Sequence, residues 1–213
     1  LLQRDDFGYR HINCFTMDAE DLNDKSNRES KSEVVLLDIL KERAKLLNPE
    51  IPIECIDDAI DIFTKKRTHM SPVAANKEIY NLIKDGILVE YDGKNGRKEQ
   101  GTVKLISFED ITKNDFLAVT QLWIKGDRRF RRPDVILYIN GIPLVFIELK
   151  NSNIKIKQAF DKNLTEYKED IPQLFLYNAF CILSNALETK VGSFTAGWEF
   201  FFRWLRVDDE KEK

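Results

Sequence analysis

Two acidic residues and one lysine are the residues of this chain whose types and spacing could support hydrolytic chemistry. Asp134 opens one apolar run, Glu148 and Lys150 close a second, and the dipeptide Asn140-Gly141 lies between them. Asn-Gly between apolar runs is a strong signal for a β-hairpin, so both carboxylates are expected at one end of it. Glu148 and Lys150 share a face because side chains alternate along a strand. Buried charges are costly unless they are paired or bind a metal, so this arrangement predicts a metal site.

The predicted hairpin cannot be regular if the two carboxylates are to share a cation. A strict two-residue turn at Asn140-Gly141 pairs Asp134 with Ile147, which places Asp134 and Glu148 on opposite faces. A three-residue loop, with Gly141 left-handed, would restore the parity, and so would one extra residue elsewhere. The sequence therefore predicts an odd-length loop or a β-bulge somewhere in this hairpin.

Carboxylate and carbonyl oxygens are ligands suited to a hard cation, and Mg²⁺ is the expected ion, with Mn²⁺ as a substitute. Asp134, Glu148 and the backbone carbonyl of Leu149 are the candidate ligands. Such an ion would polarise the bond to be hydrolysed and lower the pKa of an attacking water. Lys150 would orient or help deprotonate that water. The plainer alternative is that Asp134 caps a turn and that Glu148 and Lys150 form an ordinary ion pair. The number of ions stays open.

A dense basic run leads directly into the hairpin. Arg128, Arg129, Arg131 and Arg132 lie just before Asp134. The net charge of −3 gives no general affinity for nucleic acid, so a DNA contact has to be local. The position beside the predicted cation site favours phosphate contacts over a merely solvated loop.

Pro133-Asp134 followed by Glu148-Leu149-Lys150 resembles the PD-(D/E)xK nuclease signature. The surrounding sequence is similar to the N-terminal nuclease domain of the restriction (R) subunit of type I restriction-modification enzymes, from about Arg28 to Trp204. The sequence motifs usual in that family are matched at residues 131–134, 140–144, 146–151, 171–175, 177–179 and 195–199.

The resemblance implies an α/β fold with a restriction-endonuclease-like central mixed β-sheet flanked by α-helices. It also implies Mg²⁺-dependent endonucleolytic cleavage of double-stranded DNA by a type I site-specific deoxyribonuclease. An ATP-binding translocase in a missing part of the subunit, and separate methylation and specificity subunits, would be the partners. Two alternatives stay open: a catalytically silent DNA-binding or docking module, and a stand-alone repair or junction nuclease of the same fold.

Further site residues follow from the resemblance alone. In related nucleases a helix glutamate approaches the metal, and Glu33 is the candidate here, with Glu29 as a rival. Family members also carry a Gln-x-x-x-Tyr motif that contacts DNA or supports the site. Asn163 and Tyr167 match its spacing with Asn in place of Gln, or Lys162 is the aligned residue. Plain core packing of Tyr167 is the alternative.

Periodicity and turn residues predict the remaining elements. Helices are expected from a Ser32 cap to about residue 48, over 53–66, over 72–84 with Gly86 after its end, and over 155–168. Strands are expected over 87–91, 102–107, 116–124, 180–183 and 190–193, the last at an edge. The domain division is an N-terminal polar segment over 1–27, the nuclease domain over 28–206 and a charged linker over 207–213.

Other classes find little support in the sequence. Three cysteines without metal-ligand spacing suggest a reduced compartment. The P-loop pattern Gly-x-x-x-x-Gly-Lys-Ser/Thr is absent from the sequence, and neither a signal peptide nor an apolar run of membrane-spanning length occurs. A soluble protein of the prokaryotic cytoplasm is expected.

Overall fold

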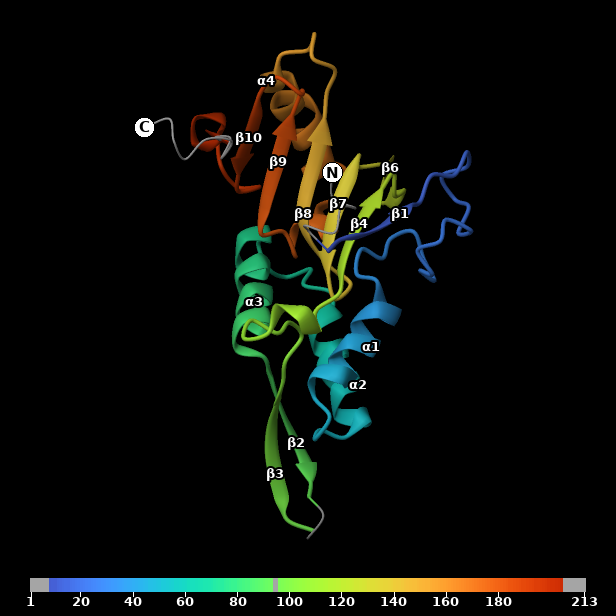
Figure 1. The fold of residues 1–213 in the computed structure, drawn as a ribbon, viewed down its shortest axis with the longest axis vertical. Coiled ribbons are helices and arrows are strands. Elements are labelled where there is room, and N and C mark those ends of the chain that lie inside the picture. Colours follow the sequence, from blue (N-terminus) through green and yellow to red (C-terminus); the bar gives the residue numbers. More distant parts are fainter. Residues whose placement is uncertain (1–7, 94–95, 205–213) are drawn as a thin grey trace.

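A mixed β-sheet organises the fold of this chain (Figure 1). The structure, a computed structural model, describes residues 8–93 and 96–204. The seven strands of the sheet lie in the order β1 (Arg10–Asn13), β4 (Phe116–Thr120), β7 (Val135–Ile139), β8 (Ile142–Leu149), β9 (Phe180–Ser184), β10 (Thr189–Gly192) and β11 (Phe202–Arg203). The β1–β4 and β8–β9 pairs are parallel, and the other neighbours are antiparallel. The predicted α/β class with a central mixed sheet is confirmed.

Helices account for most of the remaining regular secondary structure in the described residues. They are α1 (Leu37–Leu47), α2 (Ile53–Thr64), α3 (Pro72–Asp85), α4 (Ile156–Gln158), the π-helical turn η2 (Ala159–Leu164), α5 (Thr165–Asp170) and α6 (Pro172–Phe175), with 3₁₀ turns η1 (Ile111–Lys113) and η3 (Trp198–Phe200). The predicted start and stop of α3 are confirmed. The Ser71 hydroxyl accepts a hydrogen bond from the Ala74 N–H, and Gly86 follows with φ +78°.

The first helix starts at Leu37, four residues later than a cap at Ser32 predicts, and the expected cap is wrong. Arg28 donates hydrogen bonds to the carbonyl oxygens of Lys31 and Glu33, at 3.5 and 2.8 Å. The Ser30 and Ser32 hydroxyls bond to each other in a local turn. A helix capped at Ser32 would need the Glu33 carbonyl as the acceptor for one of its own N–H groups, so this segment stays non-helical.

The main hydrophobic core lies between the helices and one face of the sheet. It joins helical residues such as Leu40, Phe63 and Leu174 to strand residues such as Tyr138 and Phe146. On the other face, Ala118, Leu137 and Val145 form a small second cluster that includes no residue of a described helix. The helices therefore pack mainly on one face, and Leu149 at the end of β8 is 48% exposed rather than covered.

Two hairpins lie outside the sheet. β2 (Ile87–Asp92) and β3 (Lys98–Val103) form a ribbon that projects from the body (Figure 1). The predicted strand over 102–107 is displaced because both backbone groups of Lys104 bond to the Asn48 side chain at 2.8 Å. β5 (Ile124–Lys125) pairs with β6 (Phe130–Arg131). The strand predicted over 116–124 stops at Thr120 because Gln121 adopts φ +57°.

The two ends of the chain differ from the simplest expectation. β1 comes from the stretch that the sequence analysis set apart as an N-terminal polar segment, and it pairs with β4 of the main sheet. β10 is not an edge strand, because it pairs with both β9 and β11. The predicted linker over 207–213 lies outside the described residues. No helix in the described part of the chain is long and apolar enough to cross a membrane.

Candidate functional site

The β7–β8 hairpin contains the predicted irregularity. Asn140 and Gly141 form a two-residue turn with φ +52° and +80°, and Ile139 pairs with Ile142. The register then shifts, because Tyr138 pairs with Pro143 whereas Leu137 pairs with Val145. The extra residue is Leu144, so the bulge lies in β8 and the three-residue loop is not formed.

The bulge brings the two predicted carboxylates to one face of the hairpin. Beyond it, Val135 pairs with Ile147, so the next position of the ladder places Asp134 opposite Glu148. Directly opposed side chains on one face have Cβ atoms about 5 Å apart. The negative charge of Asp134 also contributes to a raised pKa of Glu148, as expected for near neighbours.

Asp134 is fixed by two other segments. Its Oδ2 accepts a hydrogen bond from the Leu149 N–H at 2.8 Å, and its Oδ1 accepts one from Gln121 Nε2 at 3.3 Å. The Gln121 N–H donates to the Asp134 carbonyl at 3.1 Å. Gln121 therefore holds both the backbone and the side chain of Asp134 from a positive-φ position. The sequence analysis missed this residue, and only the unusual backbone angle marks it.

Glu148 is almost completely buried, with 2% of its surface exposed. Lys150 Nζ lies 2.6 Å from its Oε1, whereas its Oε2 is buried and has no hydrogen-bond partner among the described residues. Burial raises the pKa of Glu148 to about 7, opposed by the Lys150 ammonium. An unpartnered carboxylate oxygen in this position fits a site that binds a cation.

The fit to a hard divalent ion depends on few protein ligands. No group of three His, Cys, Asp or Glu side chains that could hold a metal occurs among the described residues. Asp134, Glu148 and the backbone of Leu149, whose N–H bonds to Asp134, are the protein groups brought together. This number of ligands is compatible with Mg²⁺, which commonly keeps several waters and binds through one or two carboxylates.

Glu33 and Glu29, the candidate helix glutamates, precede α1 rather than belong to it. Glu33 Oε2 accepts a hydrogen bond from the Glu29 N–H at 3.1 Å, and the Glu29 side chain is exposed. None of the contacts of the described residues joins either glutamate to Asp134 or Glu148. Their approach to the metal stays a prediction.

Tyr167 lies at the carboxylate pair and also packs in the core. Its ring contacts Phe146 edge-on, with centroids 5.2 Å apart, and its hydroxyl donates to the Arg132 carbonyl at 2.9 Å. Burial raises the pKa of the Tyr167 hydroxyl, and the negative charges of Glu148 and Asp134 raise it further. The position of Tyr167 is therefore compatible both with a role in DNA contact or site support and with plain core packing.

The polar partner of Tyr167 in the family motif is not fixed by the helix geometry. Asn163 lies in the π-helical turn η2, where hydrogen bonds span five residues instead of four. In such a turn, residues five apart can share a helix face as residues four apart do in an α-helix. Lys162, five residues before Tyr167, therefore stays a candidate for the polar partner of Tyr167. The Asn163 side chain is half-buried and forms no hydrogen bond with the described residues. Its role in DNA binding stays a prediction.

The four arginines of the basic run have different environments. Arg128 and Arg129 are exposed in the turn between β5 and β6, which a 2.9 Å bond from the Gly126 N–H to the Arg129 carbonyl closes. Arg131 is bound to Asp170 and Glu166, at 2.6 and 2.9 Å.

Arg132 lies over two aromatic rings. Its guanidinium carbon is 5.0 Å from the ring centroid of Phe15 and 4.8 Å from that of Trp123. The sequence analysis identified neither ring, because they lie 117 and 9 positions away along the chain and share no motif with Arg132.

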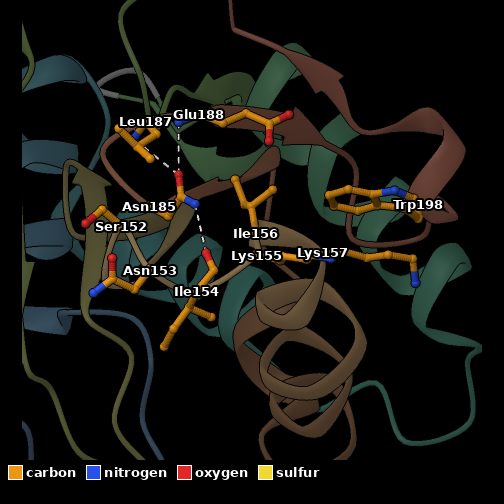
Figure 2. A pocket seen from close by; sticks show the side chains of 10 residues that line it. All are labelled: Ser152, Asn153, Ile154, Lys155, Ile156, Lys157, Asn185, Leu187, Glu188 and Trp198. Atoms are coloured by element: carbon orange, nitrogen blue, oxygen red, sulfur yellow. Dashed lines mark hydrogen bonds between the residues drawn. The ribbon is translucent and has the colours of Figure 1, made fainter.

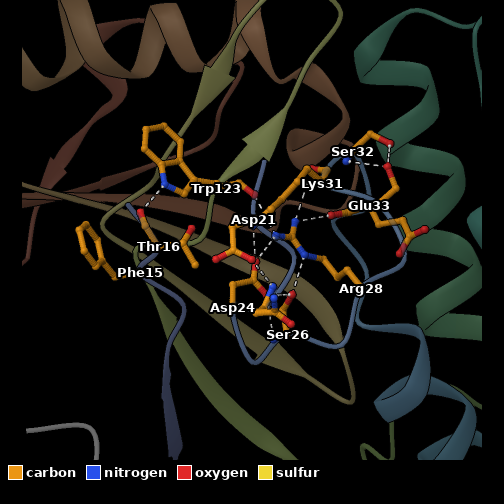
Figure 3. A network of polar contacts seen from close by, with 12 residues as sticks. Phe15, Thr16, Asp21, Asp24, Ser26, Arg28, Lys31, Ser32, Glu33 and Trp123 are labelled. Carbon is orange, nitrogen blue, oxygen red and sulfur yellow. Dashed lines mark hydrogen bonds and ion pairs between the residues drawn. The ribbon is translucent and has the colours of Figure 1, made fainter. Parts of the chain in front are cut away.

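A buried ionic network connects the N-terminal loop to this region (Figure 3). Asp24 Oδ2 lies 3.0 Å from an Arg28 nitrogen and 2.7 Å from Lys31 Nζ, and these three side chains are at most 4% exposed. Arg28 also donates to the Trp123 carbonyl at 2.9 Å, and the Trp123 indole N–H donates to the Thr16 carbonyl at 3.1 Å. The sequence analysis placed Asp24 only within the N-terminal polar segment over 1–27 and missed this network. Its spacing to Arg28 and Lys31 was the available signal.

A hollow of about 390 Å³ begins two residues beyond Lys150 (Figure 2). It is lined by residues 152–157, 185, 187, 188 and 198. Asn185 braces it by donating to the Ile154 carbonyl at 2.8 Å and accepting from the Glu188 N–H at 2.9 Å. The Asp134–Glu148 pair does not line this hollow, so the chemistry of the site does not depend on it.

Comparison with known proteins gives consistent matches. Residues 1–200 match the family model described as "Type I restriction enzyme R protein N terminus". The HindI type I restriction enzyme endonuclease subunit of Haemophilus influenzae is 37% identical over 193 residues, covering 89% of this chain and 18% of that protein. A Methanocaldococcus jannaschii protein bearing the name of the MjaIXP type I restriction enzyme endonuclease subunit is 34% identical over 214 residues, covering 97% and 19%. The chain thus spans less than a fifth of these relatives.

Proposed function

Because this chain belongs to the family of type I restriction enzyme R protein N-terminal regions, we propose that it hydrolyses phosphodiester bonds of double-stranded DNA with Mg²⁺. The observation that carries this proposal is the pair of Asp134 and Glu148 across the bulged hairpin, where Glu148 keeps one buried oxygen without a partner. A plain ion pair between Glu148 and Lys150 would leave that oxygen unexplained. Mn²⁺ is the expected substitute for Mg²⁺.

The roles of the residues follow from their contacts. Asp134, oriented by Gln121 and the Leu149 N–H, would bind the cation together with Glu148. When bound, the ion supplies Lewis-acid activation of the phosphate and of a water. A bound cation would neutralise the Glu148 carboxylate, so that Lys150 would no longer be needed to balance the charge of Glu148. Lys150 can then orient the attacking water and stabilise the negative charge that develops on the phosphate.

The activity of the whole protein is a further part of the proposal, since relatives are more than five times longer than the matched region. We propose that the remaining sequence provides an ATP-driven translocase that follows the 207–213 linker. Methylation and specificity subunits would select the DNA, and the complex would act in the prokaryotic cytoplasm. Arg128 and Arg129, exposed at the β5–β6 turn, would contact phosphates near the site.

The test uses the full-length subunit assembled with its methylation and specificity partners. Asp134→Ala and Lys150→Ala should abolish plasmid cleavage while DNA-stimulated ATP hydrolysis continues. Glu109→Ala is the control, because that side chain is 85% exposed and lies outside the site. If the two site variants cut DNA like the wild type, this region is a docking or structural module instead. Activity of the isolated region on branched DNA without ATP would favour a stand-alone nuclease.

A further inference from the structure

Arg132 differs from its neighbour Arg131 in what holds it. Arg131 is neutralised by two carboxylates of α5, Glu166 and Asp170. No acidic side chain among the described residues lies within ion-pair distance of Arg132. Its guanidinium instead lies over the rings of Phe15 and Trp123. An aromatic face attracts a cation without occupying the N–H donors at its edge.

Hydrogen bonds fix the backbone of Arg132 and the Trp123 ring beneath its guanidinium group. Its carbonyl accepts the Tyr167 hydroxyl at 2.9 Å. Trp123 is held through its indole N–H by the Thr16 carbonyl and through its own carbonyl by Arg28. Figure 3 shows Phe15, Thr16 and Trp123 beside the Asp24–Arg28–Lys31 network. The N-terminal loop therefore supplies one ring and braces the other.

Arg132 is also close in sequence to the candidate metal ligand Asp134. It lies two residues before Asp134, and its carbonyl is bound by the Tyr167 side chain that packs against Phe146. Tyr167 experiences the charges of both carboxylates and, in the opposite sense, those of Arg131 and Arg132. A cation without a carboxylate partner in the described part of the chain thus acts on the same Tyr167 hydroxyl as the two carboxylates that would hold a metal.

We propose that Arg132 binds a phosphate of the DNA strand at the metal site, and that Phe15 and Trp123 are positioning residues that hold its guanidinium for this contact. The inference rests on the proposed nuclease function and deepens it. Guanidinium groups bind phosphate through paired N–H donors, and these donors are left available when the face of the group is against aromatic rings. The N-terminal loop is then part of the nuclease site, although it carries no residue of the signature.

Phe15 gives the sharper test because its ring is 49% exposed and its truncation opens no buried cavity. In the full-length subunit assembled with its partners, Arg132→Ala should slow DNA cleavage about 100-fold. Phe15→Ala should slow it about five- to tenfold, and Phe15→Tyr should retain wild-type cleavage because the ring remains. ATP hydrolysis should be unchanged in all three. Arg97→Ala and Phe108→Ala are matched controls, since both residues are exposed and lie outside the site.

A double-mutant cycle separates positioning from simple structural support. If Phe15 acts through Arg132, Phe15→Ala causes no further loss when Arg132 is already alanine. An equal loss in both backgrounds would overturn the positioning role, and wild-type cleavage by Arg132→Ala would overturn the phosphate contact. Failure of the nuclease proposal is distinguishable, because Asp134→Ala would then also cut DNA normally.

Discussion

Replacing Glu148 with Gln should stabilise the folded chain at alkaline pH while it abolishes cleavage. In the folded chain Glu148 is 2% exposed, and only one of its two oxygens has a partner among the described residues. Burial raises its pKa from the ordinary 4.5 to about 7. The ionised carboxylate is therefore a source of instability until a cation binds, and Gln removes the charge while keeping the shape.

The sign and size of the effect follow from linkage. Below pH 4.5 Glu148 is protonated in both states, so the substitution has little effect there. Between pH 4.5 and 7 the unfolded chain releases the proton first, and wild-type stability falls as pH rises. Above pH 7 the difference of about 2.5 between the two pKa values corresponds to roughly 3 kcal/mol. Since Gln weakens the contact with Lys150, we expect a net gain of about 1–3 kcal/mol at pH 8.

Thermal unfolding of the chain at pH 4.5 and pH 8, with and without Mg²⁺, measures this effect. A gain of 1–3 kcal/mol corresponds to an increase in Tm of roughly 3–10 °C for a domain of this size. Mg²⁺ should raise the Tm of the wild type at pH 8 and leave that of Glu148→Gln nearly unchanged. Glu109→Gln is the control for loss of an exposed carboxylate. An equal Tm difference between wild type and Glu148→Gln at both pH values would refute the reasoning.

Three other variants test the framework around the site and the basic run that precedes it. Asp24→Ala leaves Arg28 and Lys31 as buried charges without their acid, so urea unfolding should show a loss of about 3–5 kcal/mol. Gly141→Ala should cost about 2 kcal/mol or more in the same assay, because φ is +80° and a Cβ would collide with the Leu36 carbonyl; a near-neutral result would show that the turn relaxes. Combined Arg128→Ala and Arg129→Ala should weaken DNA binding and reduce its log–log salt dependence by up to about 2, whereas unchanged salt dependence would exclude phosphate contacts there.

The local parts of the fold were predictable because their signals lie within a few residues. The turn at Asn140-Gly141 and the caps of α3 depend on backbone preferences of neighbouring residues. The bulge was predictable for a different reason, namely that only an irregular hairpin brings Asp134 and Glu148 to one face. Its location at Leu144 was not predictable, because the Leu144 carbonyl is bound by Ala179, which lies far along the chain.

The errors came from long-range hydrogen bonds that override local preference. Arg28 binds the Glu33 carbonyl that the helix predicted from Ser32 would have needed, and Asn48 binds the backbone of Lys104 across 56 positions. Neither contact is marked in the sequence by a hydrophobic periodicity or a turn motif. The same applies to Phe15 and Trp123, whose relation to Arg132 exists only after β1 and β4 have paired. Local rules therefore located the acidic pair but not Gln121, Phe15 or Trp123, which lie around it.

Several departures from regular structure concern the acidic pair or Tyr167. Gln121 has a positive φ and holds Asp134, Leu144 is bulged, and Glu148 keeps a buried oxygen without a described partner. The π-helical turn η2 lies immediately before α5, which carries Tyr167. Each departure costs free energy, whereas α3, for example, follows local rules closely. The bulge brings the two carboxylates to one face of the hairpin and Gln121 holds Asp134 there, which is the arrangement that the proposed cation site needs.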